Sequence, residues 1–170
     1  MVPTKTGVYK IHYRGVQEMI YQGAKKYPVT EVVVHCTATQ DSWMKGKPTA
    51  SKVAAIDKWH RDRKWRMIGY HYVIDTDGTV AVGRKETEIG AHVKGHNRGT
   101  IGISLVGGFG GAADDKFEEW FTKDQRRALA KLIRDIASRT DVKRVTGHNR
   151  YAAKACPCFE VSDEFPWPPK

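Results

Sequence analysis

Two histidines and a cysteine, His35, His148 and Cys156, have the residue types and positions that suit a metal ion. His35 lies at the end of the β-branched run EVVVHC, and the other two follow a strand-like run that ends near Thr146. A catalytic zinc takes three protein ligands and keeps a fourth position for water, and two histidines with one cysteine form an observed set. Strands that lie side by side can bring residues distant in sequence to one ion. The pattern therefore supports the hypothesis of a catalytic zinc site.

The cysteines leave alternatives open. Cys158 competes with Cys156 as the sulfur ligand, because the sequence C-P-C can present either thiol. A redox pair of the two ranks lower, since thioredoxin-like sites use C-x-x-C, which does not occur in this chain. Strand alternation turns Cys36 away from His35, so we expect Cys36 to pack as a small apolar side chain.

The remaining histidines are interpreted more simply. His35 alone could be a buried histidine bonded to a backbone carbonyl, and only its combination with two further ligand types favours a metal. His92 and His96 have the spacing of two ligands on one helix face, but the glycines around them predict a loop, and the metallopeptidase pattern H-E-x-x-H does not occur. We assign structural roles to the other histidines, which are His12, His60 and His71.

Secondary structure elements that would position the site are indicated by apolar periodicity and by turn and cap residues. In chain order they are a strand at 31–36, a helix at 50–63, a hairpin at 69–75 and 79–83 around TDG, a strand at 101–108, a helix from 122 to about 138, and a strand at 141–146. Thr122 and Gln125 form a capping-box pattern at the start of the last helix. The apolar stripe of the first helix is Val53, Ile56, Trp59 and His60, and that of the last helix is Leu129, Leu132, Ile133 and Ile136.

This order of elements predicts an α/β (α+β) fold, a single domain with a mixed central β-sheet flanked by helices, in which sites form from loops at strand ends. We divide the chain into an N-terminal extension at 1–28 and the main domain at 29–170. Residues 13–27 are expected to form a helix that packs on the domain and ends at Pro28. The prolines of the tail FPWPPK lack amide donors, so the tail should lie along the surface.

The composition limits the class of protein. The 29 Lys and Arg residues against 19 Asp and Glu give a net charge of +10, which favours polyanionic partners such as nucleic acid, anionic lipid or an anionic wall polymer. Three cysteines, an odd number, argue against a disulfide framework. Neither a signal peptide's apolar core nor an apolar run of membrane-spanning length is found, so we expect a soluble protein made in a cytoplasm.

Four stretches of the chain resemble one family in order and spacing: VVVHCTAT, IDKWHRDRKWRMIGYHYVIDTDGTVAVGR, GAHVKGHNRGTIGISLVGG and HNRYAAKACPCF. They are similar to the zinc-dependent N-acetylmuramoyl-L-alanine amidases, particularly the small phage lysozymes, which are relatives of the animal peptidoglycan-recognition proteins. The matching blocks run from about residue 31 to 160. The chain departs from the family at Lys64, where a glycine often precedes the tryptophan, and at Cys158; residues 1–28 have no counterpart.

The resemblance implies roles for particular residues. One Zn²⁺ per chain would be held by His35, His148 and Cys156, with Tyr70 and Lys154 as catalytic residues. A histidine of the family's substrate cleft corresponds to His92. The resemblance also implies that residues 29–170 form a zinc amidase domain with a mixed β-sheet and flanking helices, the fold of the amidases and the peptidoglycan-recognition proteins.

The implied activity is that of a peptidoglycan hydrolase, an endolysin that cleaves the amide between N-acetylmuramic acid and L-alanine of the stem peptide. Two alternatives stay open: a non-catalytic peptidoglycan-binding module of the same fold, and a structural-zinc domain that binds nucleic acid. We expect a monomer that acts on the bacterial wall after release from the host cytoplasm by another factor. The phage relatives also suggest a complex with a phage-type RNA polymerase, which nothing in the residues supports.

Overall fold

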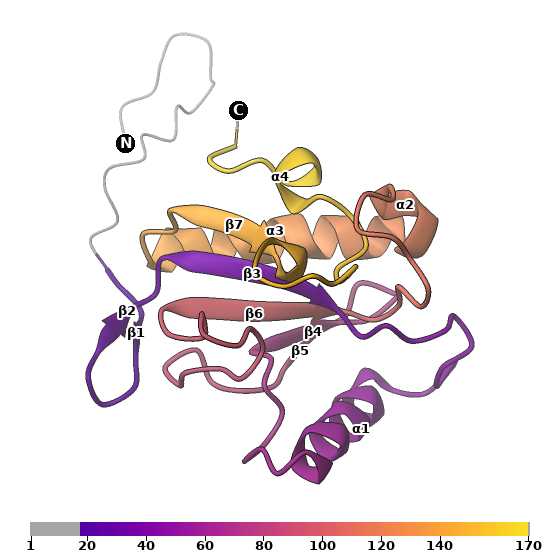
Figure 1. Cartoon of the computed structure of the whole chain (residues 1–170), viewed down its shortest axis with the longest axis horizontal. Helices are drawn as coiled ribbons and strands as arrows, with labels where there is room; N and C mark the ends of the chain where they lie inside the picture. Colours follow the sequence, from indigo (N-terminus) through magenta and orange to yellow (C-terminus); the bar gives the residue numbers. More distant parts are fainter. Residues whose placement is uncertain (1–17, 170) are drawn as a thin grey trace, which may run out of the picture.

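A mixed sheet of five strands forms the centre of the computed structural model, which describes residues 18–169 (Figure 1). The strand order is β5-β4-β6-β3-β7; β4, β6, β3 and β7 are mutually parallel, and β5 pairs antiparallel with β4. The strands are β3 (Glu31–Cys36), β4 (Tyr72–Ile74), β5 (Val80–Val82), β6 (Thr100–Leu105) and β7 (Arg144–Gly147). The predicted mixed sheet, including its hairpin, is confirmed.

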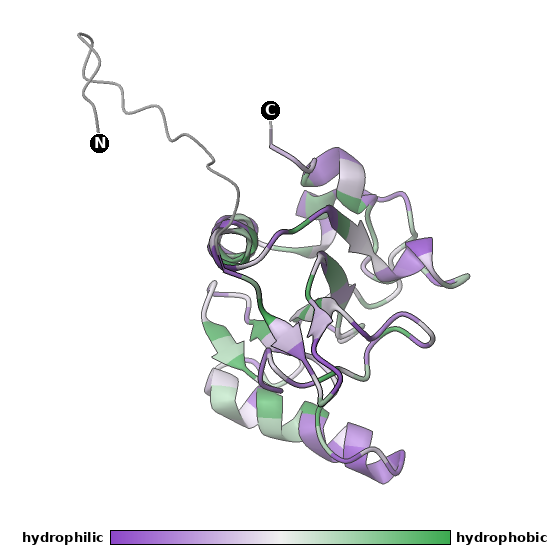
Figure 2. Ribbon diagram, turned by 90° about the vertical axis from the view of Figure 1, so that its left-hand side faces the viewer, coloured by the Kyte–Doolittle hydropathy of each residue, from purple (hydrophilic) through white to green (hydrophobic). Residues whose placement is uncertain are grey.

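Helices lie on both sides of this sheet, as Figure 2 shows with α3 seen almost end-on and α1 at the bottom of the view. The helices are α1 (Thr49–Asp62), α2 (Phe117–Trp120), α3 (Lys123–Arg139) and α4 (Val161–Glu164), with a 3₁₀ turn, η1 (His148–Arg150), directly after β7. Among residues 18–169, none of these helices has the length and apolar character needed to cross a bilayer.

Helix α3 covers the apolar face of the sheet as its sequence predicts. The Thr122 hydroxyl accepts a hydrogen bond from the backbone N–H of Gln125, whose side chain accepts one from the backbone N–H of Thr122. This capping box satisfies two amides that a helix start leaves free. The predicted stripe packs into one core cluster with the sheet; its members are Leu129, Leu132, Ile133 and Ile136.

Helix α1 lies against the other face and differs in part from the prediction. Ile56 and His60 are buried as expected, but Trp59 is exposed and Lys52 is buried instead. The Lys52 ammonium lies 2.7 Å from a carboxylate oxygen of Asp75, which is itself buried at the end of β4. An ion pair of this kind offsets the cost of burying a charge, and it ties α1 to the sheet.

The residues before β3 form a hairpin rather than a helix. Strands β1 (Tyr21–Gln22) and β2 (Tyr27–Pro28) pair antiparallel, so the helix predicted over 13–27 is wrong for its second half; its first half and His12 lie outside the described residues. The buried Gln22 side chain donates to the carbonyl of Thr100 and accepts from the N–H of Gly99. These hydrogen bonds join residues about 78 positions apart and hold the hairpin against the domain. The division of the chain into an extension at 1–28 and a domain at 29–170 stays a prediction.

The C-terminal tail is less superficial than its prolines suggest. Phe165 is buried in the core cluster that contains α3, and the indole N–H of Trp167 donates to the carbonyl of Val142. The two aromatic rings anchor a segment that has no regular structure, which corrects the expectation that the tail only follows the surface.

Candidate metal centre

The structure brings His35, His148 and Cys156 together, with one ligand atom of each residue within 4.8 Å of the others. The Nδ1 atoms of His35 and His148 lie 3.2 Å apart, and Nδ1 of His35 lies 3.9 Å from Sγ of Cys156. Two nitrogens bound to a tetrahedral zinc are about 3.3 Å apart, and a nitrogen and a sulfur about 3.6 Å apart, at usual bond lengths. The donor set and its spacing therefore fit zinc.

Sheet register explains how residues 113 positions apart meet. Strands β3 and β7 are parallel neighbours, with Val34 opposite Gly147. His35 follows Val34 on β3, and His148 follows Gly147 at the end of β7. Because the two strands are parallel, both imidazoles lie at the same end of the sheet. This is the arrangement expected from the two strand ends.

Cys156 reaches the cluster because the chain turns back after η1. The N–H of Asn149 donates to the carbonyl of Cys156 at 2.8 Å, and the N–H of Cys158 donates to the carbonyl of Ala155 at 2.6 Å. A Cβ on Gly147 would lie 2.9 Å from Cδ of Pro157, so the absence of a side chain at Gly147 lets the returning segment approach the end of β7 closely.

The imidazoles of the cluster favour the neutral form that a metal needs. Burial, followed by the nearby charges of His92 and His148, holds the pKa of His35 well below its ordinary value. Burial also lowers the pKa of His148, with Lys154 as the second cause. Both side chains can therefore offer a nitrogen lone pair at neutral pH.

The three thiols differ in the direction of their pKa shifts, and this difference favours Cys156 as the sulfur of the cluster. Hydrogen bonds with the Cys36 side chain and from its backbone N–H lower the pKa of Cys156. The bond with Cys156 raises the pKa of Cys36 to about 12, and a bond with Cys36 together with burial raises that of Cys158. Since a thiolate is the metal ligand, Cys156 is the sulfur best prepared for this role.

Cys158 points away from the cluster. Its Sγ lies 3.9 Å from Sγ of Cys36 and donates to the carbonyl of Gly108 at 3.2 Å, and both thiols belong to the apolar core. The expectation that Cys36 packs as an apolar residue is confirmed by its burial.

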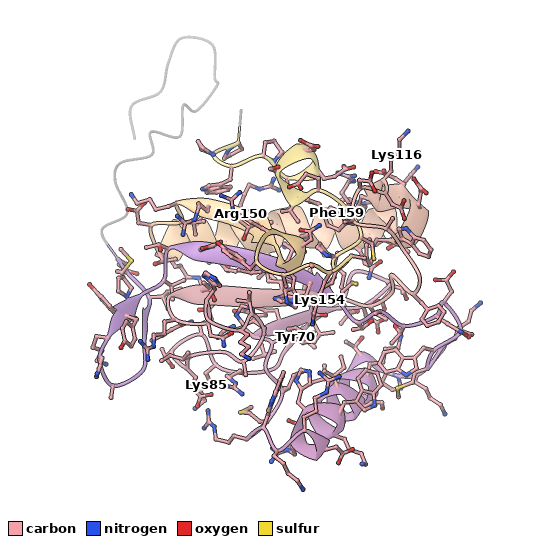
Figure 3. All side chains as sticks on the ribbon, viewed as in Figure 1. Tyr70, Lys85, Lys116, Arg150, Lys154 and Phe159 are labelled. Atoms are coloured by element: carbon pink, nitrogen blue, oxygen red, sulfur yellow. The ribbon has the colours of Figure 1, made fainter. Side chains whose placement is uncertain are left out.

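Tyr70 and Lys154 flank the cluster from two different segments, before β4 and after η1, and are labelled at the centre of Figure 3. The Tyr70 ring centroid lies 5.1 Å from that of His35, and burial raises the pKa of the phenol, which keeps it protonated. The Lys154 side chain is exposed, and its positive charge adds to the causes, burial first for the two histidines and the Cys36 hydrogen bond first for Cys156, that lower the pKa of the three cluster residues.

His92, for which the resemblance implies a place in the substrate cleft, is buried beside His35. Its side chain is only 7% exposed, and both ring nitrogens face protein atoms: Nδ1 lies 2.9 Å from Nε2 of His35, and Nε2 lies 3.1 Å from Oγ1 of Thr100. In the structure His92 therefore contacts a cluster residue from the protein interior; its role toward substrate stays a prediction. The glycines at 90 and 102, whose Cβ atoms would overlap the His92 ring, are the sequence signal for this buried position.

Comparison with known proteins places the chain among amidases. The family model described as N-acetylmuramoyl-L-alanine amidase matches residues 25–159. The endolysin of Escherichia phage T7 is 38% identical over 132 residues, which cover 76% of this chain and 81% of that protein. The solved structure of the N-acetylmuramoyl-L-alanine amidase LysC from Clostridium intestinale has a TM-score of 0.64 and 26% identity, covering 79% of this chain and 81% of that one.

The fold alone is shared more widely. Bumblebee PGRP-SA superposes with a TM-score of 0.69 at 23% identity, covering 92% of each chain. The predicted resemblance and the predicted fold are both confirmed, and the chain belongs to the N-acetylmuramoyl-L-alanine amidase family.

Proposed function

We propose that this chain is a zinc-dependent peptidoglycan amidase of the endolysin type, which hydrolyses the amide between N-acetylmuramic acid and L-alanine. Family membership supports the amidase activity, and similarity to a phage endolysin supports the bacterial wall as its target. The observation that carries the zinc assignment is the convergence of His35, His148 and Cys156 within 4.8 Å.

Zinc at this cluster would supply a water whose pKa falls to about 7 and would polarise the amide carbonyl. His35, His148 and Cys156 would hold the ion as two neutral imidazoles and one thiolate, a donor set that in catalytic zinc sites is completed by water or substrate. Among residues 18–169, no fourth His, Cys, Asp or Glu offers a ligand atom within 4.8 Å of all three ligand atoms, which supports a catalytic centre over a closed structural one.

Lys154 and Tyr70 supply the polar groups around the reacting amide. The Lys154 ammonium stabilises the negative charge that develops on the carbonyl oxygen, an effect that typically accelerates turnover about 10²- to 10³-fold per donor. The phenol of Tyr70 stays protonated and donates a hydrogen bond, either to the attacking water or to the carbonyl oxygen. The proton released by the water passes to the departing amine of L-alanine.

The net charge of +10 suits the anionic bacterial wall and favours association with it at low salt. All three proposed metal ligands come from one chain, which supports a monomer as the active form. We place the action of the protein at the wall, after release from the cytoplasm in which it is made.

Metal analysis combined with mass spectrometry of digested peptidoglycan tests the proposal. We expect one zinc per chain and products in which N-acetylmuramic acid keeps its lactyl acid while L-alanine gains a free amine. Binding to peptidoglycan without release of amines would instead identify a non-catalytic module. A zinc with four protein ligands would overturn the mechanism and favour a structural metal.

A further inference from the structure

A chain of polar contacts leads from the cluster into the protein. Nε2 of His35 lies 2.9 Å from Nδ1 of His92, and Nε2 of His92 lies 3.1 Å from Oγ1 of Thr100. The Thr100 hydroxyl in turn lies within hydrogen-bonding distance of the Asn97 and His96 carbonyls, at 2.9 and 3.2 Å. The chain therefore ends on backbone oxygens, which only accept hydrogen bonds.

A metal at the cluster would determine which group donates and which accepts in each hydrogen bond of this series. Nδ1 is the nitrogen of His35 that faces His148 and Cys156, so it would bind the metal through its lone pair, and the proton of the neutral ring would then be on Nε2 and be donated to His92. His92 then accepts on Nδ1, carries its own proton on Nε2, and donates to Thr100. The Thr100 hydroxyl donates to a backbone carbonyl, and every group in the chain is satisfied.

The protein is shaped to hold the His92 ring in this position. A Cβ at Gly102 of β6 would lie 2.5 Å from Cγ of His92, and one at Gly90 would lie 2.5 Å from its Cδ2. The backbone N–H groups of His92 and Val93 both donate to Oδ1 of Asn97, at 2.9 and 2.8 Å. The ring therefore occupies a slot between two glycines, and its backbone is fixed by a side chain of the same loop.

We infer that His92 is a positioning residue, which accepts the Nε2–H of His35 and so fixes the ring orientation and tautomer with which His35 binds zinc. This inference rests on the proposed function. Hydrogen bonds of this kind behind metal-binding histidines typically account for about 10- to 100-fold in metal affinity. His92 would act without touching substrate, in contrast to the role that the family resemblance implies.

Imidazole ¹⁵N NMR of the zinc-loaded wild-type protein tests which ring nitrogens of His35 and His92 donate and which accept. We expect His35 and His92 each to carry one proton on Nε2, with Nδ1 of His92 unprotonated and accepting. A His92 ring protonated on Nδ1, or a His35 ring that binds zinc through Nε2, would overturn the inference. This measurement needs no variant and does not depend on turnover.

Zinc affinity of variants, measured by competition with a chelator, tests the contribution of the contact. His92→Phe keeps a ring in the slot but has no acceptor, and we expect zinc to bind about 10- to 100-fold more weakly. His92→Asn offers an amide oxygen near the position of Nδ1, so it should recover a large part of the loss. Equal zinc affinity of wild type and His92→Phe would overturn the inference.

His71→Phe is the matched control. His71 is also fully buried, its ring lies 5.8 Å from that of His92, and its nitrogens bond the Gly102 N–H and the Glu88 carbonyl rather than His35. We expect the control to lower thermal stability and to leave the zinc affinity of the folded protein unchanged. A wild-type protein that binds no zinc would overturn the proposed function itself, whereas unchanged binding by His92→Phe would overturn only the role of His92.

Discussion

Both faces of strand β3 are buried, but one is apolar and the other carries two polar residues, Glu31 and His35, on either side of Val33. Val32 and Val34 point into the apolar core under α3. Glu31 and His35, on the alternate positions, are just as inaccessible but polar. Burial alone therefore does not distinguish the core of this protein from its site.

What distinguishes the faces is how each side chain is satisfied. The apolar face depends on close packing, where the lost volume of a side chain sets the cost of a substitution. On the polar face each group needs a partner: Glu31 accepts hydrogen bonds from Arg144, Thr146 and Tyr151. Substitutions on the two faces should consequently affect different measurements, stability on one and metal binding on the other.

His148→Ala should have the largest effect and should affect only the polar face. Two ligands remain, so we expect zinc to be lost and amidase turnover to fall to background, while the melting temperature of the metal-free protein changes little because His148 is only half-buried. Metal content by mass spectrometry and lysis of purified wall measure both effects.

Wild-type protein stripped by a chelator is the control for His148→Ala. It should show the same loss of turnover and should recover when zinc is returned, whereas the variant should not recover. Retention of a full equivalent of zinc by the variant would contradict the assigned ligand set.

Leu129→Ala tests the apolar face. Leu129 is fully buried on α3 against the sheet, and removal of such a side chain typically lowers the free energy of unfolding by about 2–5 kcal/mol. Denaturant titration measures this loss. Zinc affinity and turnover, measured where the variant is folded, should stay at wild-type values; a loss there would show that the two faces are coupled.

The sequence predicted the apolar face better than the polar one. Local patterns are sufficient for α3, because the capping box at Thr122 and the stripe from Leu129 to Ile136 lie within one helix. Strand ends were also sufficient to place His35 near His148. These features depend on neighbours in the sequence or on the general geometry of a parallel sheet.

Features that depend on one distant partner escaped prediction. Buried Lys52 pairs with Asp75, 23 positions away, and Gln22 of the β1–β2 hairpin bonds the backbone of residues 99 and 100. Neither the composition nor the apolar periodicity of the sequence indicates which distant residues will pair. The choice of Cys156 over Cys158 differs from these cases: the local sequence leaves both thiols open, the family resemblance selects Cys156, and the structure brings Cys156 to the two histidines.

Lys154→Ala should affect turnover alone. The ammonium binds no metal, so we expect zinc content and stability to be unchanged and turnover to fall about 10²- to 10³-fold, the usual effect of removing one oxyanion donor. Arg150→Ala, which removes an exposed positive charge from the same segment, is the matched control and should keep turnover within a few-fold of wild type, roughly the scale of a screened surface charge. Equal losses in both variants would indicate wall attraction rather than catalysis.

Cys158→Ser should have the smallest effect, and it tests the boundary between the two faces. The thiol lies in the apolar core, two residues from a cluster ligand, and donates to the carbonyl of Gly108. A serine hydroxyl can keep that hydrogen bond but buries a more polar group in the core, so we expect a loss of about 1 kcal/mol in the free energy of unfolding. Zinc content and turnover should not change, because the sulfur faces Cys36 rather than the histidines.

Cys156→Ser provides the contrast, since it should lose zinc with little change in stability. A zinc-free Cys158→Ser protein would mean that both thiols serve the metal, and the separation of the two faces would then fail at this residue.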